Sequence, residues 1–229
     1  MLLNERHTAI LEVLKENRRA DVRELSARLF VSDATIRRDL REMQSLGLVE
    51  RSHGGAILRD NAEEVSIFVR MTKNAKAKEQ VATNALPLLP EFHSVFIDSS
   101  STALALAGRM DLSFKTVVTN NLETALRLSK NPNVNLILLG GNVQFRSVSS
   151  TGSWTVRQIE EFSFDLMLTS CAAIVDGEVL ERSLDQKEIK LSAFRRSKYR
   201  ILLADKSKLT SEGTYRIGAV EDFDLLVTD

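Results

Sequence analysis

The fold of the amino-terminal part follows from residues 31–40, which read Val-Ser-Asp-Ala-Thr-Ile-Arg-Arg-Asp-Leu. Ser32 is a residue type that caps a helix at its N-terminus, because its hydroxyl accepts a hydrogen bond from a free backbone N–H. Two arginines, Arg37 and Arg38, then fall on one side of the predicted helix. Three apolar residues recur on the other side at a helical period: Ile36, Leu40 and Met43. The pattern predicts a helix with a buried apolar side and an exposed basic side.

The neighbouring segments complete a small domain. Two earlier helices are expected, the first on the apolar residues Ile10, Val13 and Leu14 and the second on Leu25 and Leu29 after an Asp21 cap. Gly47 is expected to end the third helix in a left-handed C-cap. Residues 48–51 and 54–58 are then expected to form two short strands that are joined by a glycine turn. Three helices and a hairpin predict a winged helix-turn-helix domain over residues 1–58.

The third helix is the candidate DNA-reading element. A recognition helix presents its N-terminal residues to base edges, and an arginine can bind the two acceptors of guanine. The hairpin could add contacts to the DNA backbone or the minor groove. The other interpretation is an ordinary amphipathic helix with a solvated arginine side. The candidate DNA-binding residues are Ser32, Thr35, Arg37, Arg38, Arg41, Arg51, His53 and Gly54.

Bulk composition limits the remaining interpretations. The 229 residues carry 31 basic and 31 acidic side chains, so DNA binding has to come from local placement of charge. A single cysteine excludes an internal disulfide framework and favours a reducing compartment. The sequence shows neither a signal peptide nor an apolar run of the ~20 residues that a membrane span needs. We therefore expect a soluble, cytoplasmic protein.

From residue 76 onward the pattern changes to short β-rich runs that alternate with helical stretches. The expected strands are residues 94–98, 116–119, 135–139, 165–169, 200–204 and 224–227. The expected helices are residues 102–110, 122–129, 153–161 and 186–196. Nearly continuous apolar strands between helices predict a mostly parallel sheet covered on both faces, which is a Rossmann-like α/β domain over residues 76–229. Residues 59–75 are expected to be a linker with a partly helical end.

Polar residues follow several of these strands. Ligands of open α/β sheets bind outside the carboxyl ends of the strands, where hydroxyls, backbone N–H groups and a helix N-terminus can hold a phosphate. Ordinary turns and helix caps are the competing explanation, and Lys190, in a helix rich in Lys and Arg, would by itself be read as solvated. The candidate effector residues are Asp98, Ser99, Ser100, Ser101, Thr102, Thr119, Asn120, Gly140, Gly141, Lys190, Asp205 and Lys208.

Other chemistry has little support in the sequence. The three histidines are scattered and no Cys-x-x-Cys pair occurs, so no metal site is expected. The glycine-rich dinucleotide fingerprint is also absent, and no cofactor is expected. Cys171 is expected to be a small buried apolar group. Trp154 is expected to pack a helix against the sheet.

The chain resembles the DeoR family of bacterial sugar-operon regulators over essentially its whole length. The most specific matches are Thr35-Ile36-Arg37-Arg38-Asp39-Leu40 and His53-Gly54-Gly55-Ala56. Weaker matches continue in order through Asn74, Lys78, the Asp98–Thr102 segment, Asp205-Lys206-Ser207-Lys208 and Thr228-Asp229. The resemblance implies a winged helix-turn-helix joined to a sensor domain similar to ribose-5-phosphate isomerase and the CoA transferases.

The resemblance also implies a phosphorylated sugar or sugar-derived effector, binding to operator DNA as a homodimer or homotetramer, and usually repression. Ser100 departs from the family, whose members commonly have glycine there, so the loop floor gains a hydroxyl. Relatives often continue a little beyond the terminal Thr-Asp, so we expect either that a short C-terminal piece is missing from this chain or that this member is compact. Two alternatives stay open at this point: a sugar-phosphate isomerase with an appended DNA-binding domain, and a transcriptional activator. Asp98, Asp205 and Glu188 could serve an isomerase, but the sequence marks no acid–base pair.

Overall fold

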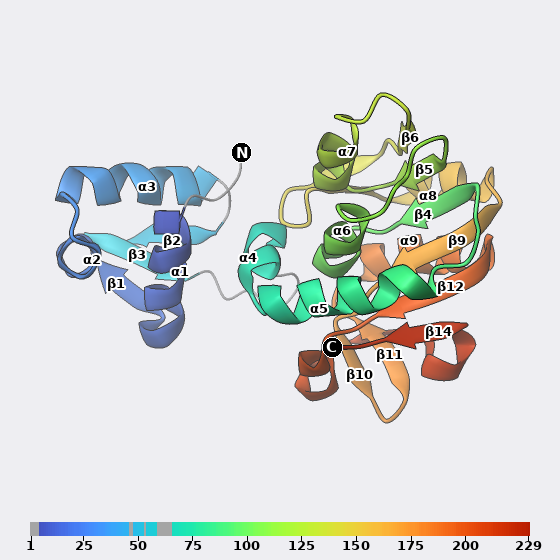
Figure 1. The fold of residues 1–229 in the computed structure, drawn as a ribbon. Helices are drawn as coiled ribbons and strands as arrows, with labels where there is room; N and C mark the ends of the chain where they lie inside the picture. The colour runs from blue at the N-terminus through green and yellow to red at the C-terminus, as the bar shows by residue number, and fades with distance from the viewer. Residues whose placement is uncertain (1–4, 46–47, 53, 59–65) are drawn as a thin grey trace. The chain divides into compact units, whose positions relative to one another are not determined.

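The computed structural model describes residues 5–45, 48–52, 54–58 and 66–229. The chain forms two compact units, Met1–Thr72 and Lys73–Asp229 (Figure 1). We call them the head and the sensor. The segment expected as a linker, residues 59–75, includes the helix α4 (Ile67–Thr72) and the start of α5. Its residues 59–65 lie outside the described residues. Ile67, Phe68 and Val69 are buried, so an apolar run makes the later part of the segment a folded element.

Besides α4, the described part of the head contains three helices and a small sheet. The helices are α1 (Glu5–Asn17), α2 (Val22–Leu29) and α3 (Asp33–Ser45). The strands β2 (Val49–Ser52) and β3 (Gly55–Leu58) form the expected hairpin. A third strand, β1 (Arg19–Asp21), pairs with β3 and had no sequence prediction. This arrangement is a winged helix-turn-helix.

Local chemistry explains the turns of the head. Asp21 caps α2 as expected, since its carboxylate accepts a hydrogen bond from the Glu24 N–H at 2.7 Å. Gly55 lets β1 approach closely, because a Cβ at this position would lie 2.2 Å from the carbonyl oxygen of Ala20. The expected C-cap Gly47 lies outside the described residues.

The sensor is built on a six-stranded parallel sheet with the order β14-β12-β9-β4-β5-β6. Its strands are β4 (Ser94–Ile97), β5 (Thr116–Thr119), β6 (Asn135–Leu138), β9 (Phe164–Thr169), β12 (Ser197–Leu203) and β14 (Leu225–Val227). The helices are α5 (Ala75–Ala85), α6 (Ser101–Ala107), α7 (Leu122–Leu128), α8 (Ser153–Glu160) and α9 (Leu184–Arg195). The Rossmann-like prediction is confirmed, and most element ends lie within a few residues of the expected ones.

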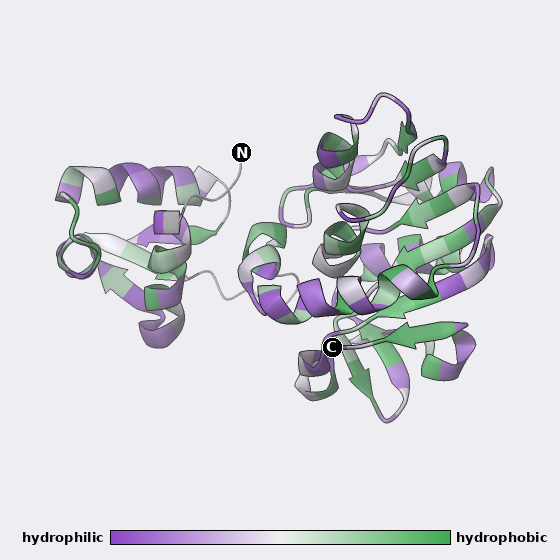
Figure 2. Cartoon of the chain, viewed as in Figure 1, coloured by the Kyte–Doolittle hydropathy of each residue, from purple (hydrophilic) through white to green (hydrophobic). Residues whose placement is uncertain are grey.

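Both faces of this sheet are covered, and successive strand residues point to opposite faces. On β4, Val95 and Ile97 pack with α5 and α6, whereas Phe96 packs with Ile159 of α8 and Ile189 of α9. Figure 2 shows these strands mostly in the colour of hydrophobic residues. The double coverage explains why the strands read as nearly continuous apolar runs in the sequence.

Smaller elements surround the large sheet and had no sequence prediction. A hairpin pairs β7 (Asn142–Gln144) with β8 (Ser149–Thr151). A second antiparallel sheet contains β10 (Ala173–Val175), β11 (Glu178–Glu181) and β13 (Tyr215–Ala219). Short 3-10 turns complete the sensor at Leu86–Leu88, Lys206–Thr210 and Val220–Asp222.

One packing prediction was wrong. Trp154 does not pack α8 against the sheet, since 62% of its surface is exposed. The buried side of α8 is formed by Thr155 and Ile159, and the Arg157 guanidinium lies 5.7 Å from the centre of the Trp154 ring. Cys171 is buried, as expected, and burial raises the pKa of its thiol to about 12. Within the described ranges, no helix is both long enough and apolar enough to cross a membrane.

Candidate DNA interface and effector site

The basic side of α3 is exposed, as the sequence predicts. Arg37, Arg38 and Arg41 are all exposed, whereas Ile36, Leu40 and Met43 are buried. Arg37 lies 4.0 Å from Asp33 one turn earlier, and Arg41 Nε donates to the Arg37 carbonyl at 3.2 Å. Both contacts are local and solvent-exposed, so they cost little to exchange for contacts with DNA.

The start of α3 is ordered by two hydroxyls. Ser32 Oγ accepts a hydrogen bond from the Thr35 N–H at 3.2 Å and lies 2.9 Å from Thr35 Oγ1. The expected Ser32 cap is therefore present. It also places the hydroxyls of Ser32 and Thr35 together at the helix N-terminus, where phosphate or a base edge would be met.

An ion pair between a partly exposed arginine and a buried aspartate fixes how α3 lies on α1. The Asp39 carboxylate is buried on α3 and binds the Arg6 guanidinium through both oxygens, with Arg6 Nη2 2.9 Å from Oδ1. His7 Nε2 also lies 3.5 Å from Oδ1. Burial would raise the pKa of Asp39, but the Arg6 contact outweighs this and keeps it below its ordinary value. The acidic residue inside the Arg-Arg-Asp motif thus orients the arginines rather than facing DNA.

The wing carries the remaining candidates for DNA contact. Arg51 is exposed on β2, and Gly54 adopts a left-handed backbone with φ +86° in the turn between the strands. A side chain at Gly54 would meet open space, so the backbone angle alone favours glycine there. His53 lies outside the described residues.

In the sensor, the strand order reverses between β4 and β9. Chain order runs outward from β4 through β5 and β6 on one side, and from β9 through β12 and β14 on the other. The crevice beside such a switch point, at the carboxyl ends of the strands, is where open α/β sheets bind ligands. Asp98 follows β4 here, Thr169 ends β9, and Ser170 comes directly after it.

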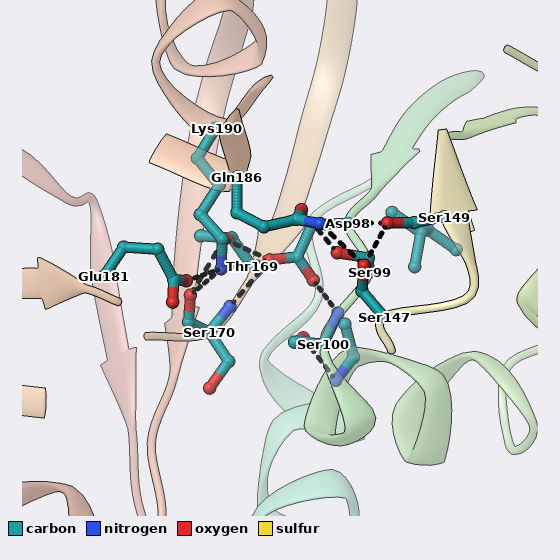
Figure 3. A network of polar contacts seen from close by, with 12 residues as sticks. Asp98, Ser99, Ser100, Ser147, Ser149, Thr169, Ser170, Glu181, Gln186 and Lys190 are labelled. Atoms are coloured by element: carbon teal, nitrogen blue, oxygen red, sulfur yellow. Dashed lines mark hydrogen bonds and ion pairs between the residues drawn. The ribbon is translucent and has the colours of Figure 1, made fainter. Parts of the chain in front are cut away.

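The Asp98 carboxylate joins the two strands across the switch point. Its Oδ2 accepts hydrogen bonds from Thr169 Oγ1 at 2.6 Å and from the Ser170 N–H at 3.3 Å, and its Oδ1 accepts from the Ser100 N–H at 2.9 Å. Lys190 Nζ lies 2.8 Å from Oδ2 (Figure 3). Complete burial would raise the pKa of Asp98, but the Lys190 charge and these hydrogen bonds outweigh it and lower the pKa.

Lys190 is buried, although the Lys- and Arg-rich sequence of its helix, considered alone, predicts a solvated side chain. Its side chain is buried, and its ammonium contacts Asp98, Glu181 Oε2 at 3.0 Å and the Ser170 carbonyl at 2.5 Å. Three partners use the three hydrogens of the ammonium. Lys190 therefore joins α9, the main sheet and β11. A direct contact between Lys190 and an effector is untested, and this geometry does not favour it.

A second buried cluster lies beside this ion pair and centres on Gln186, one turn before Lys190 on α9. Gln186 Oε1 accepts from Ser99 Oγ at 2.7 Å, and Nε2 donates to Ser147 Oγ at 3.1 Å and Ser149 Oγ at 2.9 Å. Figure 3 shows the amide between Ser99 and the Ser147–Ser149 segment. The amide thus holds two loops in fixed register.

The loop after β4 continues into α6 with hydroxyls facing its first turn. Ser100, the departure from the family glycine, caps α6 by accepting from the Ala103 N–H at 3.2 Å. The Ser101 and Thr102 hydroxyls make no hydrogen bond within the part of the chain that the structure describes. The first N–H groups of a helix also lack intrahelical partners. Hydroxyl and N–H donors are the groups that hold a phosphate.

The structure separates the other predicted effector residues into three places. Thr119 ends β5, Asn120 follows it, and both are fully buried. Thr119 Oγ1 donates to the Ile97 carbonyl at 2.7 Å, and Asn120 Nδ2 donates to the Ser150 carbonyl at 3.0 Å. Gly140 and Gly141 follow β6, two strands away from β4. Helix α8 occupies that turn, since Thr155 Oγ1 and Gln158 Nε2 both donate to the Gly140 carbonyl.

The third place is the Asp205–Lys208 turn after β12. Asp205 is buried, and its Oδ1 accepts from the Ser207 N–H at 3.2 Å and from the Ser207 hydroxyl. Its Oδ2 is buried and has no partner among the described residues. The Lys208 charge acts on Cys171 directly after β9, where it opposes the effect of burial on the thiol pKa. The turn therefore lies near the switch point.

Sequence reasoning missed Thr169, which ends a predicted strand, and four further residues of this site: Ser147, Ser149, Glu181 and Gln186. One signal was available, because Gln186 and Lys190 are spaced i, i+4 and therefore share a helix face. The other three come from the hairpin and the small sheet that had no prediction. No group of three or more possible metal ligands occurs among the residues that the structure describes.

Comparisons with known proteins agree with both units. Residues 6–62 match the sequence model of the DeoR-like helix-turn-helix domain, and residues 73–229 match that of the DeoR C terminal sensor domain. The HTH-type transcriptional regulator GolR of Listeria innocua is 35% identical over 98% of this chain and 90% of its own length. The glycerol-3-phosphate regulon repressor of Haemophilus influenzae is 32% identical over 97% of this chain and 88% of its own length.

Among solved structures, ribose 5-phosphate isomerase A from Methanocaldococcus jannaschii aligns with a TM-score of 0.42 and 13% identity, over 59% of this chain and 55% of that one. The relatives are regulators and the matched domains are those of regulators, so the chain is not the isomerase-like enzyme of the alternative interpretation. With both domain models matched in order and most of the chain covered, this protein belongs to the DeoR family of DNA-binding transcriptional regulators.

Proposed function

We propose that the chain represses a carbohydrate-use operon and leaves its operator when a phosphorylated sugar or related metabolite binds the sensor. The observation that carries this proposal is the division of polar groups between the units. The head exposes an arginine side on α3, and the sensor gathers polar groups at its switch point. A relative is named for repression of a glycerol-3-phosphate regulon, which supports an effector of this class.

In the proposed complex, α3 enters the major groove of operator DNA. Arg37, Arg38 and Arg41 contact base edges and phosphates, with Ser32 and Thr35 at the helix N-terminus. Arg51, His53 and Gly54 of the wing contact the backbone. The chain acts as a homodimer or homotetramer in the cytoplasm, because paired heads match the two half-sites of an operator.

In the proposed effector site, Ser101 and Thr102 bind the phosphate through hydroxyl and N–H donors, and Lys208 supplies positive charge. Asp205 Oδ2 accepts a hydrogen bond from a sugar hydroxyl. This contact would satisfy a buried oxygen that has no hydrogen-bond partner among the described residues, and leaving such an oxygen unpaired is costly. The shape of the loop after β4 is set by Asp98, Ser99, Ser100 and Lys190. The ends of β5 and β6 contribute Thr119, Asn120, Gly140 and Gly141.

The test measures DNA binding by the head and effector binding by the sensor separately. An operator is first selected from random DNA with the wild-type protein, and phosphorylated sugars are screened by thermal shift. Arg38→Ala should lower operator affinity about 10- to 100-fold, the range for one bidentate base contact, and keep the thermal response. Thr102→Ala should do the reverse. Loss of both responses in each folded variant would contradict the proposal.

A promoter–reporter assay separates repression from activation. Deletion of the gene should raise expression from a promoter that carries the operator. Expression that falls instead would support the activator alternative.

A further inference from the structure

The Asp205–Lys208 turn contacts the first residues of the sensor, close to where the chain leaves the head. The boundary between the units follows Thr72, so Asn74 is the second residue of the sensor. Asn74 Nδ2 donates to Ser207 Oγ at 2.9 Å and lies 3.5 Å from Asp205 Oδ1. These contacts join residues that are more than 130 positions apart in the sequence.

Asn74 is placed for this contact rather than for capping its helix. It precedes α5 in a left-handed backbone conformation, with φ 55° and ψ 34°, and its side chain makes no capping hydrogen bond. Asparagine tolerates this backbone region better than most residues. The side chain therefore points to the turn after β12 and not to the N–H groups of its own helix.

A second side chain holds the same segment. Lys78, one turn along α5, is buried and donates from Nζ to the Lys73 carbonyl at 2.8 Å. The Lys78 N–H also donates to the Asn74 carbonyl at 3.1 Å. Residues 73 and 74 are thus fixed to the sensor through both side-chain and backbone contacts.

Asp205 connects this segment to the proposed effector site. One carboxylate oxygen serves Ser207 and Asn74, and the other is buried without a partner among the described residues. A ligand hydroxyl that donates to this second oxygen would rotate the same carboxylate that Asn74 contacts. Two-state elements of this kind pass a local change along the chain.

We infer that Asn74 is a positioning residue that couples the Asp205–Lys208 turn to the chain segment that leaves the head. Without ligand, the Asn74–Ser207 contact holds residues 73–74 and favours operator binding. Ligand on Asp205 breaks the contact, frees the segment and lowers operator affinity. The inference rests on the proposed function and adds how the sensor reports its occupancy.

The experiment breaks the contact from both sides in the full-length protein. Asn74→Gly removes the amide but keeps the left-handed backbone, and Ser207→Ala removes the acceptor. Asn84→Ala is the matched control, because Asn84 also lies on α5 and its Nδ2 donates to the Thr228 carbonyl at 2.8 Å. Operator affinity is measured without ligand on DNA selected by the wild-type protein, and amide hydrogen exchange is followed over residues 73–85.

Asn74→Gly and Ser207→Ala should each weaken operator binding roughly 3- to 10-fold, the effect of one hydrogen bond, and should speed exchange of the Lys78 amide. The double variant should lose less affinity than the sum of the two single losses, because both substitutions break the Asn74–Ser207 contact. The Asn84→Ala protein should behave as wild type in both measurements.

Several results would overturn the inference. Faster exchange with unchanged operator affinity would make the contact merely structural, and unchanged exchange would show that it does not hold the segment. Additive losses in the double variant would show two independent effects. A wild-type protein that selects no DNA would instead contradict the proposed function, and the exchange measurement would still decide whether Asn74 holds residues 73–74.

Discussion

The head and the sensor place their functional polar groups in opposite ways. In the head, the arginines of α3 are exposed, and each makes at most local contacts with its own helix. In the sensor, Asp98, Gln186 and Lys190 are almost fully buried and share partners. An exposed side chain can be substituted without leaving a buried partner unpaired, whereas the loss of one side chain from a buried network leaves its partners unsatisfied. The comparison teaches that substitutions should affect binding in the head and folding in the sensor.

The largest effect is expected at Lys190. Lys190→Met leaves the Asp98 and Glu181 carboxylates buried without their cation, which should destabilise the sensor by about 3–5 kcal/mol. Urea unfolding followed by circular dichroism measures the loss. Lys187→Met is the control, because the ion pair that Lys187 forms among the described residues is with the half-exposed Glu188 at 3.0 Å. Equal, small losses in both variants would remove the contrast between buried and exposed groups.

A smaller effect, dependent on pH, is expected at Asp98. The folded-state pKa of Asp98 lies below its unfolded value of ~3.9, so its contribution to stability is present above that pH and is lost as pH falls through the folded pKa. Asp98→Asn should cost about 1.5–3 kcal/mol at pH 7, the range for hydrogen bonds to a charged group. The gap to wild type should narrow below pH 4.

Urea unfolding of both proteins at several pH values checks this. A gap that stays constant down to pH 3 would mean that the carboxylate charge is not what stabilises the site. The Lys190 ammonium works in the opposite direction, because its pKa is raised. Its contribution is present below its unfolded pKa of ~10.4 and is lost only as pH rises through the folded value.

The smallest effect tests strained, exposed residues in both units. Phe30 ends α2 with φ 54° and is 94% exposed, and Phe114 in the sensor has φ 61° and is 85% exposed. The left-handed region costs a residue other than glycine roughly 1–2 kcal/mol. Phe30→Gly and Phe114→Gly should each raise the free energy of unfolding by about 0.5–1 kcal/mol. The gain is smaller than the relieved strain, because glycine has more conformational entropy in the unfolded chain and this offsets part of it.

Thermal unfolding of the two single variants and the double variant measures these gains. They should add, because exposed side chains in separate units share no partner. A loss of stability in Phe30→Gly would show that the aromatic ring does more than fill a turn.

The sequence predicted the head better than the sensor, for a physical reason. Capping by Asp21 and Ser32, and the apolar side of α3, depend on residues within one helical turn. The contacts of Lys190 depend on elements far away in the sequence, namely β4 and β11. Lys190 follows Lys187 and precedes Arg195, so its local context is that of a solvated helix.

Other sensor features were beyond local patterns for the same reason. The strands β7 and β8 have three residues each, too few to show a period. The role of Gln186 appears only when the loops of Ser99 and Ser147 are brought together. Trp154 was misplaced because an aromatic residue in an α/β helix usually packs inward, whereas Thr155 and Ile159 fill that position here.

The most direct measurement is a linkage titration of the wild-type protein. A phosphorylated sugar that raises its melting temperature is titrated with and without operator DNA, and the operator is titrated with and without that sugar. The account predicts that each ligand weakens the other by the same factor. A sugar that stabilises the sensor but leaves operator affinity unchanged would contradict it.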